Sequence, residues 1–244
     1  MIYKLNLGGE TKVNVDMSSE KVAGNVSALK LPIEGYKKLK KVYIPYKFFK
    51  RITDIILSFI LLIGLFPAFA IISLAIKLES KGPILFKHTR IGKDGKIIKI
   101  YKFRSMVENA EDLIQKFTPE QMKEYEENYK LSDDPRITKV GKFLRKTSLD
   151  ELPQLINIIK GDLAIIGPRP VVANELKKYG TNIKKFLSVT PGLTGYWAAN
   201  GRSCTSYEQR MQMELYYIDN LSLKMDVMVF FKTIEAVVRR KGAV

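Results

Sequence analysis

The chain has 244 residues, enough for one sizeable domain and an appendage. Its 41 Lys and Arg against 25 Asp and Glu give a net charge of +16, which indicates an anionic partner: nucleic acid, an acidic membrane surface or a phosphorylated substrate. The single cysteine, Cys204, excludes a disulfide framework, and with one histidine, His88, it also excludes a zinc cluster of Cys and His ligands.

Residues 1–35 are polar and mixed, and we expect an auxiliary N-terminal extension. Residues 37–51 then mix lysines and an arginine with Tyr43, Tyr46, Phe48 and Phe49. Lysine stems that reach toward water and aromatic rings at headgroup depth are typical of a membrane–water interface. A solvated charge run stays open as an interpretation of residues 37–41 alone.

Residues 55–76 form an uncharged run of 22 residues. A straight helix of that length would be ~33 Å long and could cross a bilayer. Pro67 lies near its middle and Gly64 three residues earlier. An interior proline removes a backbone hydrogen bond and clashes with the preceding turn, so we expect a kink or break there.

Cations flank the run on both sides, with Lys47, Lys50 and Arg51 before it and Lys77, Lys81, Lys87 and Arg90 after it. The positive-inside rule then places both ends in the cytoplasm, which favours a re-entrant helix–break–helix over a kinked full span. A signal peptide is rejected, because the cleavage-like 68–70 lies inside the run and far from the N-terminus. We therefore expect three parts: an extension (1–46), a re-entrant membrane helix (47–77) and a cytoplasmic catalytic domain (78–244).

Beyond this run the pattern changes to mixed strands and helices. Residues 84–90 and 97–103 predict two strands joined by a glycine-bounded turn at 92–95, a hairpin signal. Residues 108–130 predict two helices, the second starting near Pro119, and carry seven acids against three lysines. Residues 137–146 form a short basic segment. The expected class is α+β, with a small sheet and amphipathic interfacial helices on a monotopic membrane protein.

Residues 146–170 combine two adjacent carboxylates, Asp150 and Glu151, with a predicted helix that ends at Gly161. Its apolar stripe would be Leu152, Leu155, Ile156 and Ile159. A short apolar strand (163–166) and the stiff loop 167–170 follow.

The carboxylates have a structural interpretation, because acids are favoured in a first helical turn and Ser148 with Glu151 matches a capping box. If Ser148 caps the helix, Pro153 falls at an unfavourable interior position, whereas with Asp150 as the cap it lies in the first turn. The sequence leaves both caps open.

The C-terminal third alternates helices with turns. A helix is expected over 171–179, and glycine-rich turns follow at 190–197 and 200–202. Ser206 and Gln209 form a capping-box signature for the next helix. The last helix starts near Ser222 and is amphipathic, with its apolar face formed by Val227, Phe230, Phe231, Ile234, Val237 and Val238.

Six cations are expected in or beside turns and strand ends: Lys102, Arg104, Arg136, Arg145, Arg169 and Arg202. Guanidinium groups bind phosphate with two parallel hydrogen bonds. A carboxylate that attacks phosphorus needs Mg²⁺ and cations to offset the charge of substrate and transition state. The combination indicates phosphoryl chemistry on a membrane substrate. Walker, kinase and GxGxxG loops are missing from the sequence, so ATP and NAD are not indicated.

From Lys50 to Arg240 the chain resembles the bacterial sugar transferase family, the monotopic phosphoglycosyl transferases. The resemblance lies in ordered motifs: Lys50-Arg51-x-x-Asp54, the apolar run with Pro67, YKFRSM at 101–106, DPR at 134–136, TSLDELPQL at 147–155, GD at 161–162, GPRP at 167–170, PGLTG at 191–195, NGR at 200–202 and YY at 216–217. Together they cover about four-fifths of the chain, and the combination is highly specific.

The resemblance implies that Asp150 attacks the β-phosphorus of a UDP-sugar, releases UMP and carries the phosphosugar until polyprenol (undecaprenyl) phosphate accepts it. It implies Mg²⁺ at Asp150 and Glu151, with Glu151 assisting as metal ligand or in proton handling. It further implies phosphate binding by Arg145 and Arg169, and places Arg202 near the nucleotide. Lys102, Arg104 and Arg136 complete the expected substrate-binding set, and Lys50, Arg51 and Pro67 the expected membrane set.

The implied location is the bacterial inner membrane, with the catalytic domain on the cytoplasmic face and membrane lipids as partners. The reaction would be the first membrane step of exopolysaccharide, capsule or other glycoconjugate synthesis. The insert 108–133 looks like that of members that transfer galactose or glucose 1-phosphate. The chain departs from the family at His88, where Gln is frequent, and at Phe66, where some members have Ser.

Two other functions compete with this reading. A nucleic-acid-binding protein would explain the charge but not the uncharged run, so we expect no nucleic-acid partner. A non-catalytic membrane scaffold would use Asp150 and Glu151 only to cap a helix.

Overall fold

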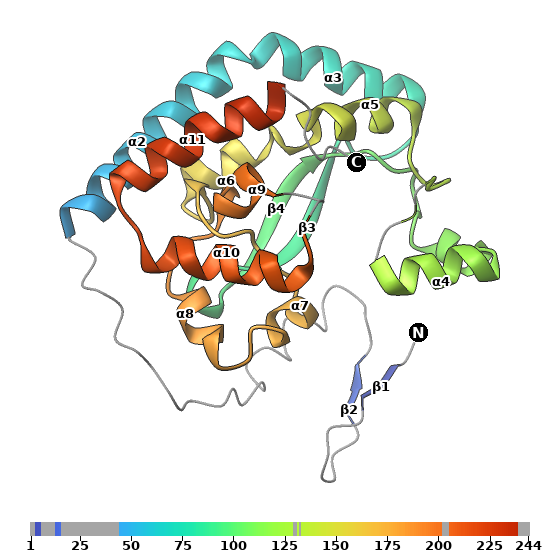
Figure 1. Cartoon of the computed structure of the whole chain (residues 1–244). Coiled ribbons are helices and arrows are strands. Elements are labelled where there is room, and N and C mark those ends of the chain that lie inside the picture. Colours follow the sequence, from blue (N-terminus) through green and yellow to red (C-terminus); the bar gives the residue numbers. More distant parts are fainter. Residues whose placement is uncertain are drawn as a thin grey trace.

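A long antiparallel hairpin runs through the centre of the molecule, and helices lie around it (Figure 1). The computed structural model describes residues 3–5, 13–15, 44–128, 131, 133–201 and 205–238. The strands are β1 (Tyr3–Leu5), β2 (Val13–Val15), β3 (Leu85–Ile91), β4 (Ile97–Phe103), β5 (Ala164–Ile166) and β6 (Gly192–Thr194). The helices are α2 (Ile44–Gly64), α3 (Phe66–Glu79), α4 (Pro119–Asn128), α5 (Lys139–Thr147), α6 (Gln154–Lys160), α7 (Ala173–Lys177), α8 (Ile183–Leu187), α9 (Tyr196–Asn200), α10 (Tyr207–Asp219) and α11 (Leu223–Val238).

Among the described residues, β1 pairs with β2 and β3 with β4 in antiparallel orientation, and β5 pairs with β6 in parallel orientation. The hairpin β3–β4 agrees with the sequence prediction, and its turn contains the short 3₁₀ segment η1 (Lys93–Gly95). The mixture of helices and small sheets confirms the α+β class. In the predicted two-helix stretch, the first part is only a 3₁₀ turn, η2 (Asp112–Lys116), and the second is α4, which starts at Pro119 as expected.

The apolar run bends where the sequence predicts a break. Helix α2 ends at Gly64 and α3 begins at Phe66, so Pro67 lies in the first turn of α3, where a missing N–H costs nothing. The two helices are bent by 62° relative to one another. Within the described residues no single helix is long and apolar enough to span a bilayer, whereas this bent pair together has the length and composition.

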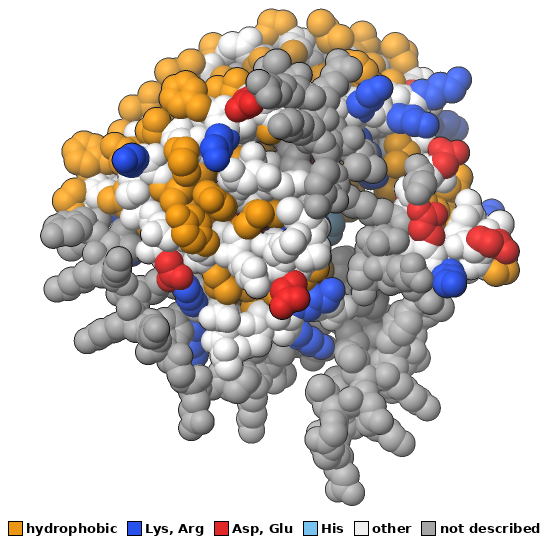
Figure 2. All heavy atoms as spheres, in the orientation of Figure 1, with side chains coloured by type: hydrophobic (Ala, Val, Ile, Leu, Met, Phe, Trp, Pro, Cys, Tyr) orange, Lys and Arg blue, Asp and Glu red, His pale blue; other side chains and the backbone are white. Residues whose placement is uncertain are grey.

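Large apolar side chains cover the outer side of the bent pair and of α11. Figure 2 shows them along the rim formed by α2 and α3. The exposed members are Phe48, Phe49, Ile52, Ile55, Ile56, Leu57, Phe59, Ile60, Leu61 and Ile63 in α2, Phe66, Ile71, Leu74 and Leu78 in α3, and Leu223, Val227, Met228, Phe230, Phe231 and Ile234 in α11. The apolar face predicted for the last helix therefore points outward, as far as its side chains are described, while Val229 and Ala236 point into the core.

Polar side chains on the inner side of α2 attach it to the rest of the molecule. Tyr46 and Lys50 both donate to Asp226 Oδ2 in α11, at 2.8 and 2.7 Å. Tyr217 in α10 donates to the other oxygen, Asp226 Oδ1, at 2.6 Å. Arg51 donates to the carboxyl end of α6. The two cations expected at the lipid headgroups, Lys50 and Arg51, are thus engaged within the protein, because buried acceptors lie opposite them.

Helix α6 lies between α2 and β4, and this position changes the predicted buried stripe. Gln154, Leu155, Asn157 and Ile158 are buried, whereas Ile156 and Ile159 are only partly buried. The prediction assumed one apolar face, but α6 is covered on two sides. Asn157 hydrogen-bonds the β4 backbone through Oδ1 to the Tyr101 N–H and through Nδ2 to the Lys99 carbonyl, at 2.9 and 2.8 Å.

Candidate active site

Asp150 and Glu151 lie in a 3₁₀ turn, η3 (Leu149–Glu151), between α5 and α6. The basic segment predicted at 137–146 forms α5, capped at its start by the Thr138 side chain. It ends at Ser148, whose φ of 59° is left-handed and reverses the chain direction into η3. Neither cap expected from the sequence is formed: the Ser148 side chain makes no capping hydrogen bond, and α6 starts after Pro153. The left-handed residue is the reason, because it ends one helix before the carboxylates.

Lys102 in β4 joins the two carboxylates. Its Nζ lies 2.6 Å from Glu151 Oε1 and 3.6 Å from Asp150 Oδ2. Asp150 is only 7% exposed, and burial raises the pKa of its carboxyl; Glu151 adds to this effect, while Lys102 and Arg145 oppose it. Asp150 is therefore a partly desolvated carboxylate whose charge is balanced by neighbouring cations. Such a group is a good nucleophile once a substrate excludes water.

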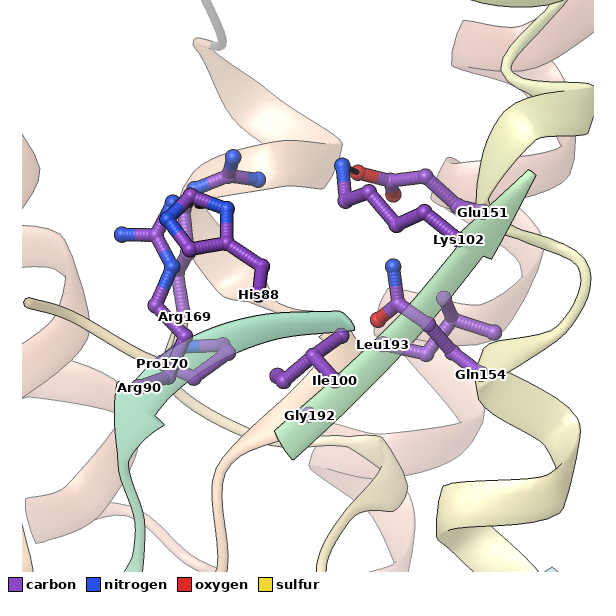
Figure 3. A pocket seen from close by; sticks show the side chains of 10 residues that line it. All are labelled: His88, Arg90, Ile100, Lys102, Glu151, Gln154, Arg169, Pro170, Gly192 and Leu193. Carbon is purple, nitrogen blue, oxygen red and sulfur yellow. Dashed lines mark hydrogen bonds and ion pairs between the residues drawn. The ribbon is translucent and has the colours of Figure 1, made fainter. Parts of the chain in front are cut away.

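A hollow lies beside the pair (Figure 3); its volume of about 320 Å³ includes the solvent space at its open mouth. Its lining comes from β3, β4, η3, α6, the loop after β5, and β6: His88, Arg90, Ile100, Lys102, Glu151, Gln154, Arg169, Pro170, Gly192 and Leu193. Strand alternation explains the hairpin's share, since His88 pairs with Ile100 and Phe86 with Lys102 on one face. The hollow attracts anions, because three cationic side chains, Arg90, Lys102 and Arg169, line it against one carboxylate, Glu151.

Burial and the charges of neighbouring cations lower the pKa values of His88 and Arg90. Burial, followed by the charges of Arg90, Lys102 and Arg169, lowers the pKa of His88 to about 4, so its imidazole is neutral at pH 7. Burial also lowers the pKa of Arg90 to about 10, and Arg169 adds to this, yet Arg90 stays charged and donates to Glu175 at 3.3 Å. Because these crowded cations repel one another, an anionic ligand bound among them lowers the electrostatic energy of the site.

Close backbone packing holds the arginine loop at the hollow. A Cβ on Gly167 would lie 2.6 Å from the Thr190 carbonyl oxygen, and one on Gly192 would meet the backbone of Gly167. Glu214 in α10 accepts the Arg169 backbone N–H at 3.0 Å through Oε1. The Arg169 guanidinium lies 5.8 Å from the ring centre of Trp197. The loop therefore presents Arg169 on a rigid support.

The six predicted cations separate into different environments. Lys102 and Arg169 line the hollow. Arg145 lies in the last turn of α5, not in a loop, and donates to Ser105 Oγ at 2.9 Å; its charge acts on Asp150. Arg202 lies outside the described residues.

Two of the six are engaged elsewhere. Arg104 donates to the Ser80 carbonyl and hydroxyl oxygens at 2.7 and 2.9 Å, at the end of α3. Arg136 forms a two-pronged pair with Asp134, at 2.8 and 2.7 Å, and its guanidinium lies 5.0 and 5.1 Å from the rings of Phe117 and Tyr125. Both guanidinium groups are buried by structural partners rather than placed in the hollow.

Arg90, Gln154 and Glu214 are not among the site residues predicted from the sequence, and no firm role was predicted for His88. The sequence contained a signal for Arg90, because it follows His88 by two positions and side chains two positions apart point to the same face of a strand. Gln154 follows the acid pair directly after Pro153, within one helical turn of Glu151. For Glu214 we find no sequence signal, since it lies in a helix remote from the motif.

The donor set of the acid pair fits Mg²⁺. Among the described residues no three His, Cys, Asp or Glu side chains gather to hold a metal ion. Mg²⁺ does not require such a cage, because it is commonly bound by one or two carboxylates together with substrate phosphates. Asp150 and Glu151 would supply those carboxylates, and the cations that line the hollow beside them suit phosphate groups.

Known proteins share this pattern along most of the chain. The family "Bacterial sugar transferase" matches residues 45–240. An undecaprenyl-phosphate galactose phosphotransferase of Salmonella typhimurium is 41% identical over 200 residues, covering 81% of this chain and 42% of that protein. The exopolysaccharide production protein ExoY of Sinorhizobium fredii is 43% identical over 197 residues, covering 80% of this chain and 87% of that protein.

A UDP-glucose:undecaprenyl-phosphate glucose-1-phosphate transferase of Escherichia coli is 38% identical over 195 residues, covering 76% of this chain and 39% of that protein. The chain thus spans about two-fifths of the length of two of these relatives and most of the third. The matched region contains the bent helix pair, the hairpin and the carboxylate turn. This chain belongs to the bacterial sugar transferase family.

Proposed function

We propose that the chain transfers a sugar 1-phosphate from a UDP-sugar to undecaprenyl phosphate and releases UMP. The observation that carries the proposal is the buried carboxylate of Asp150 beside a hollow lined by Arg90, Lys102 and Arg169. A hollow with these cations suits a diphosphate, and a desolvated carboxylate next to it suits covalent catalysis. The names of the relatives, which act on undecaprenyl phosphate, support the same acceptor.

In the proposed first step, an oxygen of Asp150 forms a bond to the β-phosphorus of the UDP-sugar. The bond between that phosphorus and the bridging oxygen breaks, and UMP leaves with the electron pair. In the second step, a phosphate oxygen of undecaprenyl phosphate attacks the same phosphorus and the bond to Asp150 breaks. The carboxylate is regenerated, so atoms and charge balance over the cycle.

The neighbours of Asp150 have distinct tasks in this mechanism. Lys102, 3.6 Å from Asp150, and Arg145 offset the negative charge that builds up around the reacting phosphorus. Arg90 and Arg169 bind the diphosphate oxygens from the other side of the hollow. Mg²⁺, held by Asp150 and Glu151, would neutralise phosphate charge. Glu151 also keeps Lys102 in place through their 2.6 Å contact.

The acceptor requires a membrane, and the apolar surface of α2, α3 and α11 supplies the attachment. We place this surface in the bacterial inner membrane as a re-entrant hairpin, with the catalytic part on the cytoplasmic side. Support comes from the 62° bend and from the outward apolar side chains on all three helices. Labelling of single cysteines at positions 45 and 80, in a Cys204→Ser background, should occur from the same side of sealed vesicles; labelling from opposite sides would refute the hairpin.

The sugar is proposed to be a hexose such as galactose or glucose, and the product to feed exopolysaccharide or capsule synthesis. The names of the galactose, glucose and exopolysaccharide relatives motivate this choice. A panel of UDP-sugars assayed for UMP release would identify the donor.

The activity is tested with detergent-purified protein, UDP-sugars and undecaprenyl phosphate, with UMP release as the readout. Wild type should release UMP, and Asp150→Asn should lose at least about 10³-fold in rate because the nucleophile is gone. Asp219→Asn is the matched control, since Asp219 is exposed at the end of α10 and pairs with Lys185. Without the acceptor, mass spectrometry should detect a phosphosugar on wild type only. Full activity of Asp150→Asn would overturn the nucleophile assignment.

A further inference from the structure

Gln154 is a buried side chain that faces the hollow. It is the first residue of α6, is 4% exposed, and its carboxamide points into the space between His88 and Lys102 (Figure 3). Within the described part of the chain, no hydrogen bond reaches this carboxamide. Because the carboxamide lines a hollow that is partly open to solvent, water can reach it in the free protein, and a ligand that fills the hollow must replace the hydrogen bonds of that water. A ligand group that both accepts and donates would satisfy it.

His88 contributes a second neutral group to the same hollow. Its Nδ1 lies 3.4 Å from the Arg90 Nη2, and a guanidinium can only donate. Nδ1 is therefore the acceptor, and the single proton of the neutral ring lies on Nε2. The remaining polar side chains of the lining are charged: Arg90, Lys102, Glu151 and Arg169. Gln154 and His88 are its neutral hydrogen-bonding side chains.

The two kinds of group suit different parts of a nucleotide sugar. Phosphate oxygens only accept, so cations bind them best, and an amide oxygen turned toward them would be repelled. A hydroxyl group both donates and accepts, which matches a carboxamide that offers N–H and C=O. Gln154 lines the same hollow as Lys102, whose Nζ lies 3.6 Å from Asp150 Oδ2, so it lies on the side of the reacting phosphorus in the proposed mechanism. The sugar is attached at that phosphorus, whereas the nucleoside lies one phosphate further away.

We propose that Gln154 and His88 form the part of the hollow that binds hydroxyl groups of the donor's sugar ring. This inference rests on the proposed function and adds to it the residues that hold the sugar ring. Binding of a hydroxyl by buried polar groups gives strong selectivity, because a sugar that lacks the hydroxyl leaves those groups unpaired.

The test compares Gln154→Met, which keeps the length of the side chain and removes its hydrogen-bonding atoms, with wild type. Gln212→Met, at an exposed position of α10, is the matched control. The substrates are the preferred UDP-hexose and the set of UDP-deoxyhexoses that each lack one hydroxyl. The readouts are kcat/KM for UMP release and the Kd of UMP, which has no sugar at that position.

Wild type and Gln212→Met should lose about 10- to 100-fold in kcat/KM with at least one deoxy analogue. For Gln154→Met, kcat/KM with the same analogue and with the parent sugar should differ by less than about 3-fold, because the variant already lacks the group that would bind the missing hydroxyl. The Kd of UMP should stay within about 2-fold. Gln154→Glu, which keeps an acceptor but adds charge, gives a second measurement if the Met variant folds poorly, and should alter the preference among the analogues.

If both Gln154 variants lose as much kcat/KM with the deoxy analogues as wild type does, the inference is overturned. It is also overturned if the variants lose as much affinity for UMP as they lose for the donor. The latter would assign the carboxamide to the nucleotide. Failure of the proposed function has a different signature, since wild type would then release no UMP from any UDP-sugar.

Discussion

The guanidinium of Arg51 in α2 donates a 2.6 Å hydrogen bond to the backbone carbonyl of Ile158 in α6. A second bond, 2.8 Å long, reaches the carbonyl of Ile159. The last carbonyls of a helix have no partner within the helix, and a cation there also interacts favourably with the helix dipole. The proposed membrane helix therefore holds the far end of the helix whose beginning follows the carboxylate pair.

Arg51→Ala should lower the stability of the protein by about 2–3 kcal/mol, because two carbonyls lose charge-assisted hydrogen bonds. Thermal unfolding in detergent measures the effect. Arg51→Lys keeps the charge but not the two-pronged geometry, so its melting temperature should fall between those of wild type and the alanine variant. An alanine variant as stable as wild type would show that this contact does not hold α6.

Asp150→Asn should be inactive yet more stable than wild type at neutral pH. Burial raises the pKa of the Asp150 carboxyl above its unfolded value. Its stabilising contribution is therefore complete below the unfolded pKa and is lost as the pH rises through the folded pKa. The neutral amide avoids this loss. Melting temperatures should show a gain for Asp150→Asn at pH 7.5 that shrinks on acidification, whereas a lower melting temperature at pH 7.5 would contradict the prediction.

Glu214 should make the stability depend on pH between about 4.5 and 7. Burial raises the pKa of its carboxyl from 4.5 to about 7, and Oε2 has no hydrogen-bond partner within the described part of the chain. The folded state binds a proton in this range that the unfolded state has released, so stability falls as the pH rises, by about 3 kcal/mol in total. Glu214→Gln keeps an acceptor for the Arg169 N–H and should remove this slope. If the melting temperatures of wild type and Glu214→Gln change with pH in the same way, this prediction is wrong.

Arg136→Lys should weaken the attachment of the acidic insert and leave donor binding almost unchanged. The pair with Asp134 and the contacts with Phe117 and Tyr125 depend on a planar guanidinium. We expect faster proteolysis between residues 108 and 128, with the KM of the donor within about 3-fold of wild type. A KM raised more than about 10-fold without faster cleavage would instead restore the phosphate-binding role that the sequence suggested.

The sequence was sufficient for features that depend on neighbouring residues. The alternation of residues 84–103 with a glycine-bounded turn defines the hairpin, and Pro67 with Gly64 defines the break in the apolar run. Ser206 with Gln209 forms its predicted capping box, and Gly161 ends α6 with a φ of 92°. Each of these depends on contacts within a few residues, so the local sequence contains the information.

The tertiary structure decided which polar groups meet. Among the cations proposed for phosphate, Lys102 and Arg169 face the hollow, while Arg104 and Arg136 bind Ser80 and Asp134. A guanidinium looks the same in the sequence whether its partner is a substrate or a distant carbonyl. The partner depends on how α3, α4 and the hairpin pack, and burial then sets the pKa of each group. The same packing left the Gln154 carboxamide at the hollow without a hydrogen bond to any described residue, which no local pattern could have indicated.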